Sequence, residues 1–244
     1  MTLIIGIIAK DGVILASDSR MSSTLTANDT VEKIFELDEH NAVGISGDGT
    51  LASHIFDIII REHKLNFTKG IHLLAEELRS ILVTEFFEKY YSSVSPKERE
   101  ELNILLVGYS NDTPIQVPQI YNLSSGDNFI PRQSPAGHHC IGIPYLADYL
   151  LNRLYEKGKI TTPQAAKLAV FCIRETISQD RRVGGDIKVA TFSDTKKFSM
   201  LSQQEISELD SQCEEVRLLH KNKFYPEEKE SGSINSEDAT KQIS

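Results

Sequence analysis

The sequence predicts an α+β protein built as a four-layer αββα sandwich, with two antiparallel sheets between two helical layers. Blocks of strand character and blocks of helical period alternate along the chain in the order strands, two helices, strands, two helices, strands. Short turn signals join the strands within each block and indicate antiparallel hairpins. Because each sheet has apolar faces to cover, the helices are expected to form the outer layers.

Length and composition restrict the class of protein. The chain has 244 residues, of which 40% are hydrophobic and 25% charged, enough to bury a core in one or at most two domains. The longest apolar runs, residues 3–8 and 104–107, are far shorter than the roughly 20 residues that cross a bilayer, and no leader pattern opens the chain. A formal net charge of −9 argues against a nucleic-acid partner. We therefore expect a soluble, cytoplasmic protein without a membrane partner.

The first 50 residues are predicted to form two hairpins. Residues 3–9 are apolar, Lys10-Asp11-Gly12 supplies a turn, and residues 13–16 return to β-branched and apolar character. A polar loop over 21–30 follows. A second hairpin is then expected from strands at 34–37 and 42–46.

Helical period begins at Thr50. We expect two amphipathic helices, over residues 51–64 and 73–87, with a break at 66–70. The first apolar face comprises Leu51, Ile55, Ile58 and Ile59, and the second comprises Leu73, Leu74, Leu78, Leu82, Phe86 and Phe87. These stripes either face the sheets or provide surfaces for assembly.

The second half repeats the alternation of strands and helices. Thr162 before Pro163 predicts the N-cap and first position of one of its helices. The predicted elements are strands at 103–109 and 116–123 around a turn at 111–114, a Gly/Pro/His-rich loop to Gly142, helices at 145–155 and 163–178, and strands at 187–192 and 197–201.

Domain organisation follows from where the alternation stops. Residues 1–202 are expected to form one folded domain, and 203–220 a possible C-terminal helix. Residues 221–244 contain few apolar side chains and many Glu, Lys, Ser and Asn, so an acidic, disordered tail is expected there.

The sequence predicts neither a metal site nor a cofactor. Cys140, Cys172 and Cys213 are odd in number, widely spaced and outside any CxxC pattern, so we expect reduced thiols in the core. The run His138-His139-Cys140 contains residue types that could form a metal site or a Cys/His pair. Adjacent residues of an extended segment point in opposite directions, however, and other ligands at suitable spacing are missing.

Thr2 is the residue that suggests chemistry. It follows Met1 directly and leads an apolar strand. Removal of Met1 would place a hydroxyl and a free α-amine on the same residue. An α-amine with a pKa of about 7.7 to 8.0 can act as the general base that a weakly nucleophilic hydroxyl needs. If Met1 stays on the chain, this mechanism fails.

Four segments in the first 50 residues carry a family resemblance. They are TLIIG at 2–6, KDGVILASDSR at 10–20, EKIF at 32–35 and GISG at 44–47. In this order they resemble the start of proteasome β-type subunits, which are N-terminal-nucleophile hydrolases, and the chain looks like a divergent bacterial or archaeal-like member. The resemblance continues in Gly142, Pro144 and Tyr145, in Asp180-Arg181 and in Gly184-Gly185 before residues 187–190, and covers about residues 2–201. The family has the αββα layering predicted above.

The resemblance implies a role for each matching residue. Thr2 would be the nucleophile and its α-amine the base. Asp18 and Lys33 would form a charged pair beneath it, in which Lys33 favours the alkoxide and Asp18 keeps the lysine charged and oriented. Gly47 would supply the backbone N–H of an oxyanion hole, and Asp180 would help hold the terminal amine.

The resemblance also places a substrate pocket and shows two departures from the family pattern. Ile45 falls at the base of the pocket, with Met21 and Val31 as possible walls, so an apolar substrate side chain is expected. The two serines that support the amine in the family are replaced, one by Ile141 or Ile143 and the other by Val183.

The function implied is a threonine peptidase or amidohydrolase that acts on a peptide or protein substrate. It would work inside a homo-oligomer, arranged as a ring or a helical array; whether an unfoldase cooperates is left open. Two alternatives remain. One is a non-catalytic structural or interaction subunit with the same fold, which the missing serines favour. The other is the same chemistry applied to a small amide or to acyl transfer.

Overall fold

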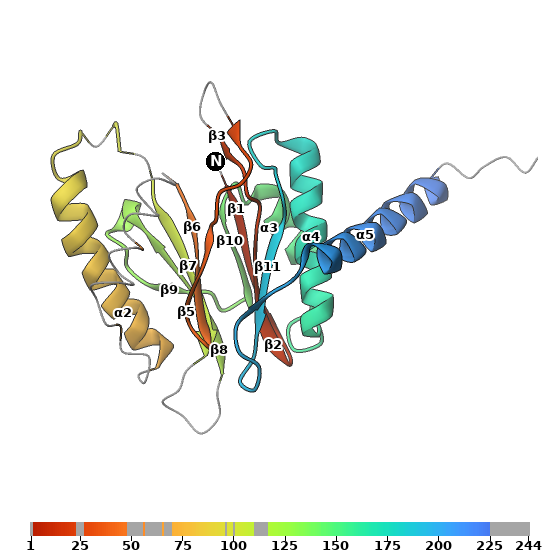
Figure 1. Ribbon diagram of the computed structural model, residues 1–244, viewed down its shortest axis with the longest axis horizontal. Coiled ribbons are helices and arrows are strands. Elements are labelled where there is room, and N and C mark those ends of the chain that lie inside the picture. Colours follow the sequence, from red (N-terminus) through yellow and green to blue (C-terminus); the bar gives the residue numbers. More distant parts are fainter. Residues whose placement is uncertain are drawn as a thin grey trace, which may run out of the picture.

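The computed structural model describes residues 2–22, 27–47, 56, 65, 70–95, 97–99, 101–109 and 117–224. Within these residues the chain forms two five-stranded antiparallel sheets, packed face to face, with helices on the outer face of each (Figure 1). The predicted four-layer α+β sandwich is therefore confirmed. Helix α2 covers one sheet, and helices α3 and α4 cover the other.

The first sheet carries the N-terminus in its interior. Its strand order is β10-β1-β2-β11-β12, so β1 lies between β10 and β2, and each neighbouring pair is antiparallel. The strands are β1 (Leu3–Ala9), β2 (Gly12–Ser17), β10 (His138–Gly142), β11 (Lys188–Phe192) and β12 (Ser199–Met200). This order fixes the first residues of the chain from both sides.

The second sheet is a meander in the order β5-β6-β7-β8-β9. Its strands are β5 (Ile34–Asp38), β6 (Asn41–Ser46), β7 (Asn103–Tyr109), β8 (Pro118–Ser124) and β9 (Arg132–Gln133), and the short 3₁₀ helix η2 (Ser125–Asp127) follows β8. A separate two-stranded sheet pairs β3 (Met21–Ser22) with β4 (Ala27–Asn28).

The apolar side chains of the strands divide between three cores because successive residues point to opposite faces. Leu3, Ile5 and Ile7 of β1 pack toward α3 and α4, whereas Ile4 packs toward the second sheet. The core between the sheets comprises Ile4, Val13, Leu15, Ile34, Ala42, Leu105, Val107, Tyr109, Ile120, Ile141, Ala190 and Phe192. Strands buried on both faces explain the continuous apolar runs in the sequence.

The helical layers bury the expected stripes. Helix α2 (Ile71–Ile81) continues into a π-helical stretch, η1 (Leu82–Tyr91), and their apolar side chains pack against the second sheet. On the other side lie α3 (Tyr145–Leu154) and α4 (Thr162–Gln179), followed by α5 (Gln203–Phe224). The stripe predicted over 73–87 thus faces the sheet, apart from Leu73, which is 43% exposed.

Several local predictions need correction. The Gly/Pro/His-rich segment before Gly142 contains β9 and β10, and β10 completes the ladder beside β1. The loop over 21–30 contains β3 and β4. The N-cap of α4 is Thr161, whose N–H donates to Gln164 Oε1 at 2.9 Å, because the hydroxyl of Thr162 is bonded to Asp11 instead.

Other predictions fall wholly or partly outside the described residues. These are the helix over 51–64, the turn at 111–114 with the start of the following strand, and the tail from 225 onward. Within the expected helix only Phe56 is described; it is buried, and its ring stacks on Phe35 with 5.3 Å between centroids. Helix α5 runs four residues further than the helix expected over 203–220.

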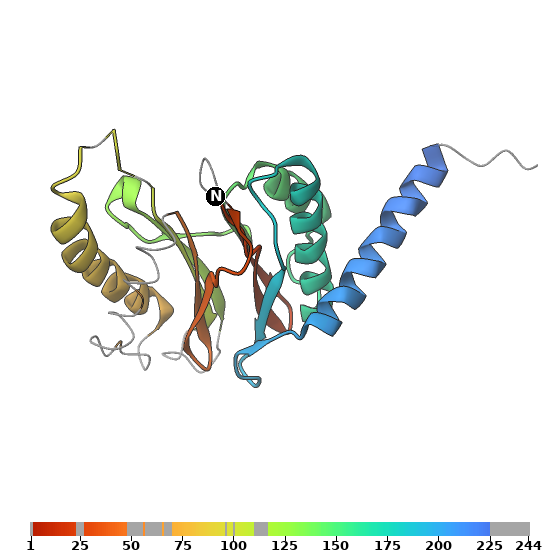
Figure 2. The ribbon, with the colours of Figure 1, turned by 45° about the horizontal axis from the view of Figure 1, so that its top comes forward.

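Helix α5 leaves the sandwich at an angle. Its first half packs on α4, and its second half extends away from the body of the domain (Figure 2). Among the described residues, none of the helices has both the length and the apolar character needed to span a bilayer.

Candidate functional site

Thr2 lies at the N-terminal end of β1. Its backbone is held by the segment that directly follows the neighbouring strand, β10. Thr2 is only 5% exposed. Its carbonyl oxygen accepts a hydrogen bond from the N–H of Ile143 at 2.8 Å, just beyond the β1–β10 ladder in which Leu3 faces Gly142. The backbone at Thr2 is therefore fixed by sheet pairing rather than left as a loose terminus.

Asp18 connects this strand head to the rest of the site. Its carboxylate is fully buried and each of its oxygens accepts two hydrogen bonds. Oδ1 accepts from the N–H of Leu3 at 3.0 Å and from Lys33 Nζ at 2.7 Å. Oδ2 accepts from the N–H groups of Arg20 at 3.3 Å and Gly184 at 3.0 Å. The chain thus satisfies a buried negative charge with one cation and three backbone donors.

Lys33 is the positive partner in this buried pair. Its side chain is 4% exposed, and Nζ also donates to the carbonyl oxygen of Arg20 at 2.7 Å. Burial lowers the pKa of Lys33, and the attraction and hydrogen bond of Asp18 oppose that shift. The expected pairing of Asp18 and Lys33 is present, and the hydrogen bond from Leu3 links it to the peptide next to Thr2.

Two glycines near the strand ends adopt backbone conformations that favour glycine. Gly142 has φ of +92°, and a Cβ there would lie 1.9 Å from the carbonyl oxygen of Thr2. Gly47 follows β6, is exposed, and has φ of +127°. A Cβ at Gly47 would lie 2.2 Å from the carbonyl oxygen of Glu101. A side chain at Gly142 would therefore disturb the backbone at Thr2, and a side chain at Gly47 would disturb the backbone that follows β6.

Asp180 ends α4 and is held by two neighbours. Its carboxylate accepts hydrogen bonds from Tyr145 Oη at 2.8 Å and from Arg182, whose Nη2 lies 2.6 Å from Oδ2. The bond with the Arg182 guanidinium is the main reason that the pKa of Asp180 lies well below its usual range. These partners could not be identified from the sequence, since Arg182 lies in a turn and Tyr145 in a different helix.

The three residues predicted to line the substrate pocket, Ile45, Val31 and Met21, lie close to the Asp18–Lys33 pair in the fold. Ile45 is buried in the core under α2, and its N–H donates to the carbonyl oxygen of Lys33 at 3.0 Å. Val31 donates its N–H to the carbonyl oxygen of Ser19 at 3.0 Å. Met21 begins β3 and is half-buried.

The positions that lack the family's serines are apolar and buried. Val183 and Ile143 belong to the core around α3 and α4, and Ile141 belongs to the core between the sheets. These side chains contribute packing. In the sequence Arg20 and Gly184 are recognisable only as motif residues, whereas in the structure their backbone atoms complete the Asp18–Lys33 network.

The histidine-cysteine run lies in β10. The ring of His138 packs edge-on against Tyr155 with 5.1 Å between centroids, and Cys140 is buried in the helix-side core. All three cysteines are free and buried, as predicted. Within the described part of the chain, His, Cys, Asp and Glu side chains form no cluster of three or more that could hold a metal ion.

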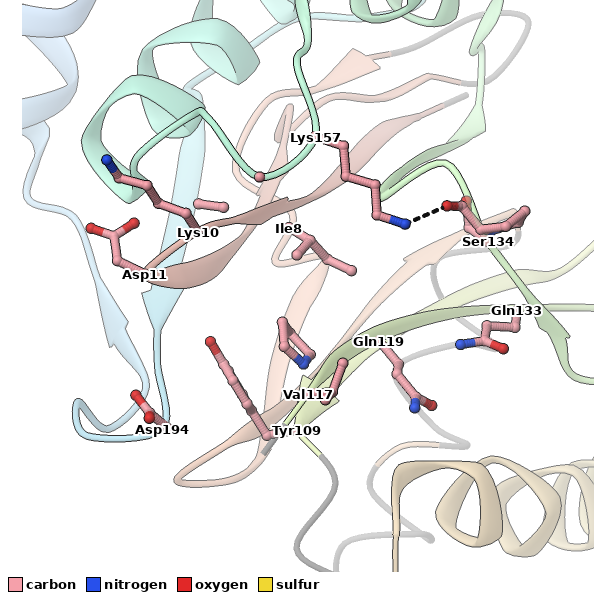
Figure 3. A pocket seen from close by; sticks show the side chains of 14 residues that line it. Ile8, Lys10, Asp11, Tyr109, Val117, Gln119, Gln133, Ser134, Lys157 and Asp194 are labelled. Carbon is pink, nitrogen blue, oxygen red and sulfur yellow. Dashed lines mark hydrogen bonds between the residues drawn. The ribbon is translucent and has the colours of Figure 1, made fainter. Parts of the chain in front are cut away.

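A cavity of about 380 Å³ lies at the opposite end of β1 from Thr2 (Figure 3). Lys10 and Asp11 of the β1–β2 turn border it, together with Tyr109 at the end of β7. On its rim Lys157 donates a hydrogen bond to the carbonyl oxygen of Pro135 at 2.8 Å. This hollow is separate from the Asp18–Lys33 network, because a whole strand lies between them.

Comparison with known proteins agrees with the geometry. Residues 2–192 match the family model described as proteasome subunit. A proteasome subunit beta from Methanothermobacter thermautotrophicus is 26% identical over 210 residues, covering 84% of this chain and 92% of that protein. A proteasome subunit beta from Methanopyrus kandleri is 25% identical over 209 residues, covering 85% and 94%. A proteasome subunit alpha from Pyrococcus abyssi is 26% identical over 230 residues, covering 91% and 83%.

Proposed function

The chain belongs to the proteasome subunit family, and on that premise we propose that it is a catalytic subunit, a threonine-type amidohydrolase with Thr2 as nucleophile. Its relatives include subunits named beta and subunits named alpha, so the choice between a catalytic and a structural role rests on this chain's own residues. The observation that carries the proposal is the buried Asp18–Lys33 pair bonded to the backbone beside Thr2.

The energetics of this pair favour a catalytic role over a structural one. Taking two charges out of water costs several kcal/mol per ion, roughly, and their attraction often fails to exceed that cost. A well-packed apolar pair would therefore stabilise the fold at least as well. A fully buried carboxylate that orients an ammonium is instead typical of sites where charge develops during reaction.

The proposed reaction begins after Met1 is removed. The α-amine of Thr2 accepts the hydroxyl proton while Oγ attacks the carbonyl carbon of a peptide or amide. The Lys33 ammonium stabilises the developing negative charge on Oγ, and the Gly47 N–H donates to the oxyanion. Collapse of the tetrahedral intermediate breaks the C–N bond, and the ammonium of Thr2 returns the proton to the leaving amine. Water then hydrolyses the Thr2 ester by the same steps.

Asp180 and the pocket residues complete the proposal. We assign Asp180 as a positioning residue that orients the terminal amine, with Tyr145 and Arg182 fixing its carboxylate. Ile45, Met21 and Val31 are assigned to the substrate pocket, and their apolar side chains favour an apolar residue at the cleaved bond. The substrate class is a peptide or protein, and the active form is a homo-oligomer.

A structural subunit is the second candidate. The observation that favours it is the apolar burial of Val183 and of Ile141 and Ile143, where the resemblance placed supporting hydroxyl groups. Without those hydrogen bonds the amine would be less well oriented, which would slow proton transfer about tenfold for one lost bond. The two candidates differ in one measurable property, hydrolysis that depends on Thr2.

Hydrolysis of a panel of fluorogenic peptides with apolar residues before the cleaved bond tests the proposal. We expect Thr2→Ala to abolish turnover and Thr2→Ser, which keeps a hydroxyl and an amine, to retain part of it. Lys33→Ala should also lose turnover, with the circular dichroism spectrum and particle mass showing that it still folds. Wild-type turnover in Lys33→Ala, or equal rates in wild type and Thr2→Ala, would refute the catalytic assignment.

A further inference from the structure

Helix α5 has an exposed face that the domain itself does not cover. Its buried side contacts α4 through Ile206 and Cys213, and Arg174 of α4 pairs with Asp210 at 2.9 Å. Arg217 of α5 pairs with Glu175 of α4 at 2.5 Å, and the C-terminal end of the helix extends away from the sandwich (Figures 1 and 2). The exposed face runs at intervals of three and four residues through Glu208, Gln212, Glu215, Leu219 and Lys223.

The far end of α5 exposes three large apolar side chains between its polar and basic residues. Leu218 and Leu219 are 51% and 56% exposed, and Phe224 is 81% exposed. At 100° per residue, Leu219 lies on the exposed face with Glu215 and Lys223, whereas Leu218 and Phe224 point to other sides of the helix. Leu219 is therefore the apolar side chain that this face presents to a partner. This end lies beyond residue 192, the last residue that matches the family model.

The near end of α5 borders a hollow. A cavity of about 740 Å³ lies between the start of α4, the β11–β12 hairpin and the first turns of α5. Leu209 and Leu201 give it an apolar lining, and Glu205, Glu208 and Gln212 of α5 lie on its rim. Glu208 and Gln212, which border this hollow, lie on the same face of α5 as Leu219 nearer its C-terminal end. This face of α5 thus carries a hollow beside its start and an exposed leucine near its end.

The charges of α5 are divided between its two halves. Residues 203–215 contain five acidic and no basic residues, whereas residues 216–224 contain three basic and no acidic residues. Two copies of α5 lying antiparallel would therefore place each basic end beside the acidic start of the other. A two-fold interface of this kind is self-complementary.

We propose that α5 is the contact between two copies of this chain, in which the projecting end of each α5 packs into the hollow beside the start of the other. An antiparallel pairing centred near Glu215 sets Lys223 opposite Glu208 and Leu219 opposite Gln212 of the second copy. Both helices are about 33 Å long at 1.5 Å per residue, so each reaches the hollow of the other. The pairing joins chains by a contact outside the family-matched region.

Cysteine cross-linking in the full-length protein tests this geometry. The three native cysteines are buried, so introduced surface thiols dominate the reaction. Glu215→Cys lies next to the predicted two-fold axis, and mild oxidation should give a disulfide-linked dimer that Leu219→Glu abolishes. Glu76→Cys, exposed on α2, is the matched control and should not cross-link. Absence of the Glu215→Cys dimer, or a dimer that Leu219→Glu leaves unchanged, would overturn the proposal.

Particle mass by light scattering tests the charge pairing. Lys223→Glu and Glu208→Lys should each reduce the mass of the particle to half or less, and the double variant should restore it, because the pair is then reversed rather than lost. A mass equal to wild type in both single variants would overturn the proposal, as would a double variant that resembles the singles. Neither readout depends on Thr2, so failure of this interface is distinguishable from failure of the proposed chemistry.

Discussion

Replacing Asp18 by asparagine is expected to destabilise the protein far more than the small change in shape suggests. Each carboxylate oxygen accepts two hydrogen bonds, so the amide NH₂ of asparagine must face donors in either orientation. The less costly orientation puts NH₂ at the Oδ2 position, because the N–H of Arg20 also donates to the carbonyl oxygen of Gly184 at 2.9 Å. The N–H of Gly184 then loses its acceptor, and Lys33 loses its counter-charge.

The magnitude follows from those two losses. A buried N–H without an acceptor costs about 1 to 3 kcal/mol, and breaking a buried ion pair costs about 3 to 5 kcal/mol. Because both losses occur at one carboxylate they are not additive, and we expect a total of about 5 kcal/mol. Domains of this kind are stable by about 5 to 15 kcal/mol, so the variant should lose about a third or more of its free energy of unfolding.

Urea unfolding at one fixed protein concentration measures this effect, since assembly makes apparent stability depend on concentration. The double variant Asp18→Asn with Lys33→Met is the decisive comparison. It removes the unneutralised ammonium and should be more stable than Asp18→Asn alone by about 2 kcal/mol or more. If Asp18→Asn lies within 1 kcal/mol of wild type, roughly the mean effect of any substitution, or if the double variant is less stable than the single, the proposed network is wrong.

Three further outcomes are expected. Gly142→Ala should lower the urea midpoint much more than Gly158→Ala, because both have positive φ but only the Cβ at 142 meets a backbone oxygen, that of Thr2, while position 158 is open; equal effects would contradict the close contact. The bond from Arg182 lowers the pKa of Asp180, so its contribution to stability is full above the unfolded pKa of about 3.9 and is lost as pH falls further; the difference in urea midpoint between wild type and Asp180→Asn should therefore be constant above about pH 5 and shrink below pH 4, and a difference that grows on acidification would show the sign to be wrong. Burial raises the pKa of the thiols of Cys140, Cys172 and Cys213, that of Cys213 to about 11. Iodoacetamide at pH 8 should therefore label none of the three in the native protein within the time that labels all three in urea. Fast labelling of the native protein would contradict their burial.

The layered fold was predictable because its signals are local and periodic. Residues 3–9 and 103–109 form apolar runs, and they form strands buried on both faces. The pairing of strands that are far apart in the sequence could not be predicted. Strand β10 contains two histidines and ends at a glycine, so its own sequence resembles a loop, and it becomes a strand because β1 offers a free edge to pair with.

The candidate site was predictable only in part. Asp18 and Lys33 could be paired from a family resemblance, and the structure brings them to 2.7 Å. The contributions of Arg20 and Gly184 come from backbone atoms, which carry no residue-type signal. The contact between Tyr145 and Asp180 spans 35 residues and depends on how α3 packs against α4. Such contacts are fixed by tertiary packing, which spacing along the chain does not encode.

Intact mass before and after treatment with a peptide epoxyketone, an electrophile selective for N-terminal threonine, shows whether Thr2 is a competent nucleophile. We expect the purified protein to lack Met1 and to gain one inhibitor mass per chain on Thr2, and we expect Thr2→Ala to gain none. Retention of Met1 would contradict the account, since Thr2 would then have no free amine to act as base. Loss of Met1 with no adduct from a series of large and small apolar epoxyketones would also contradict it and would favour the structural subunit.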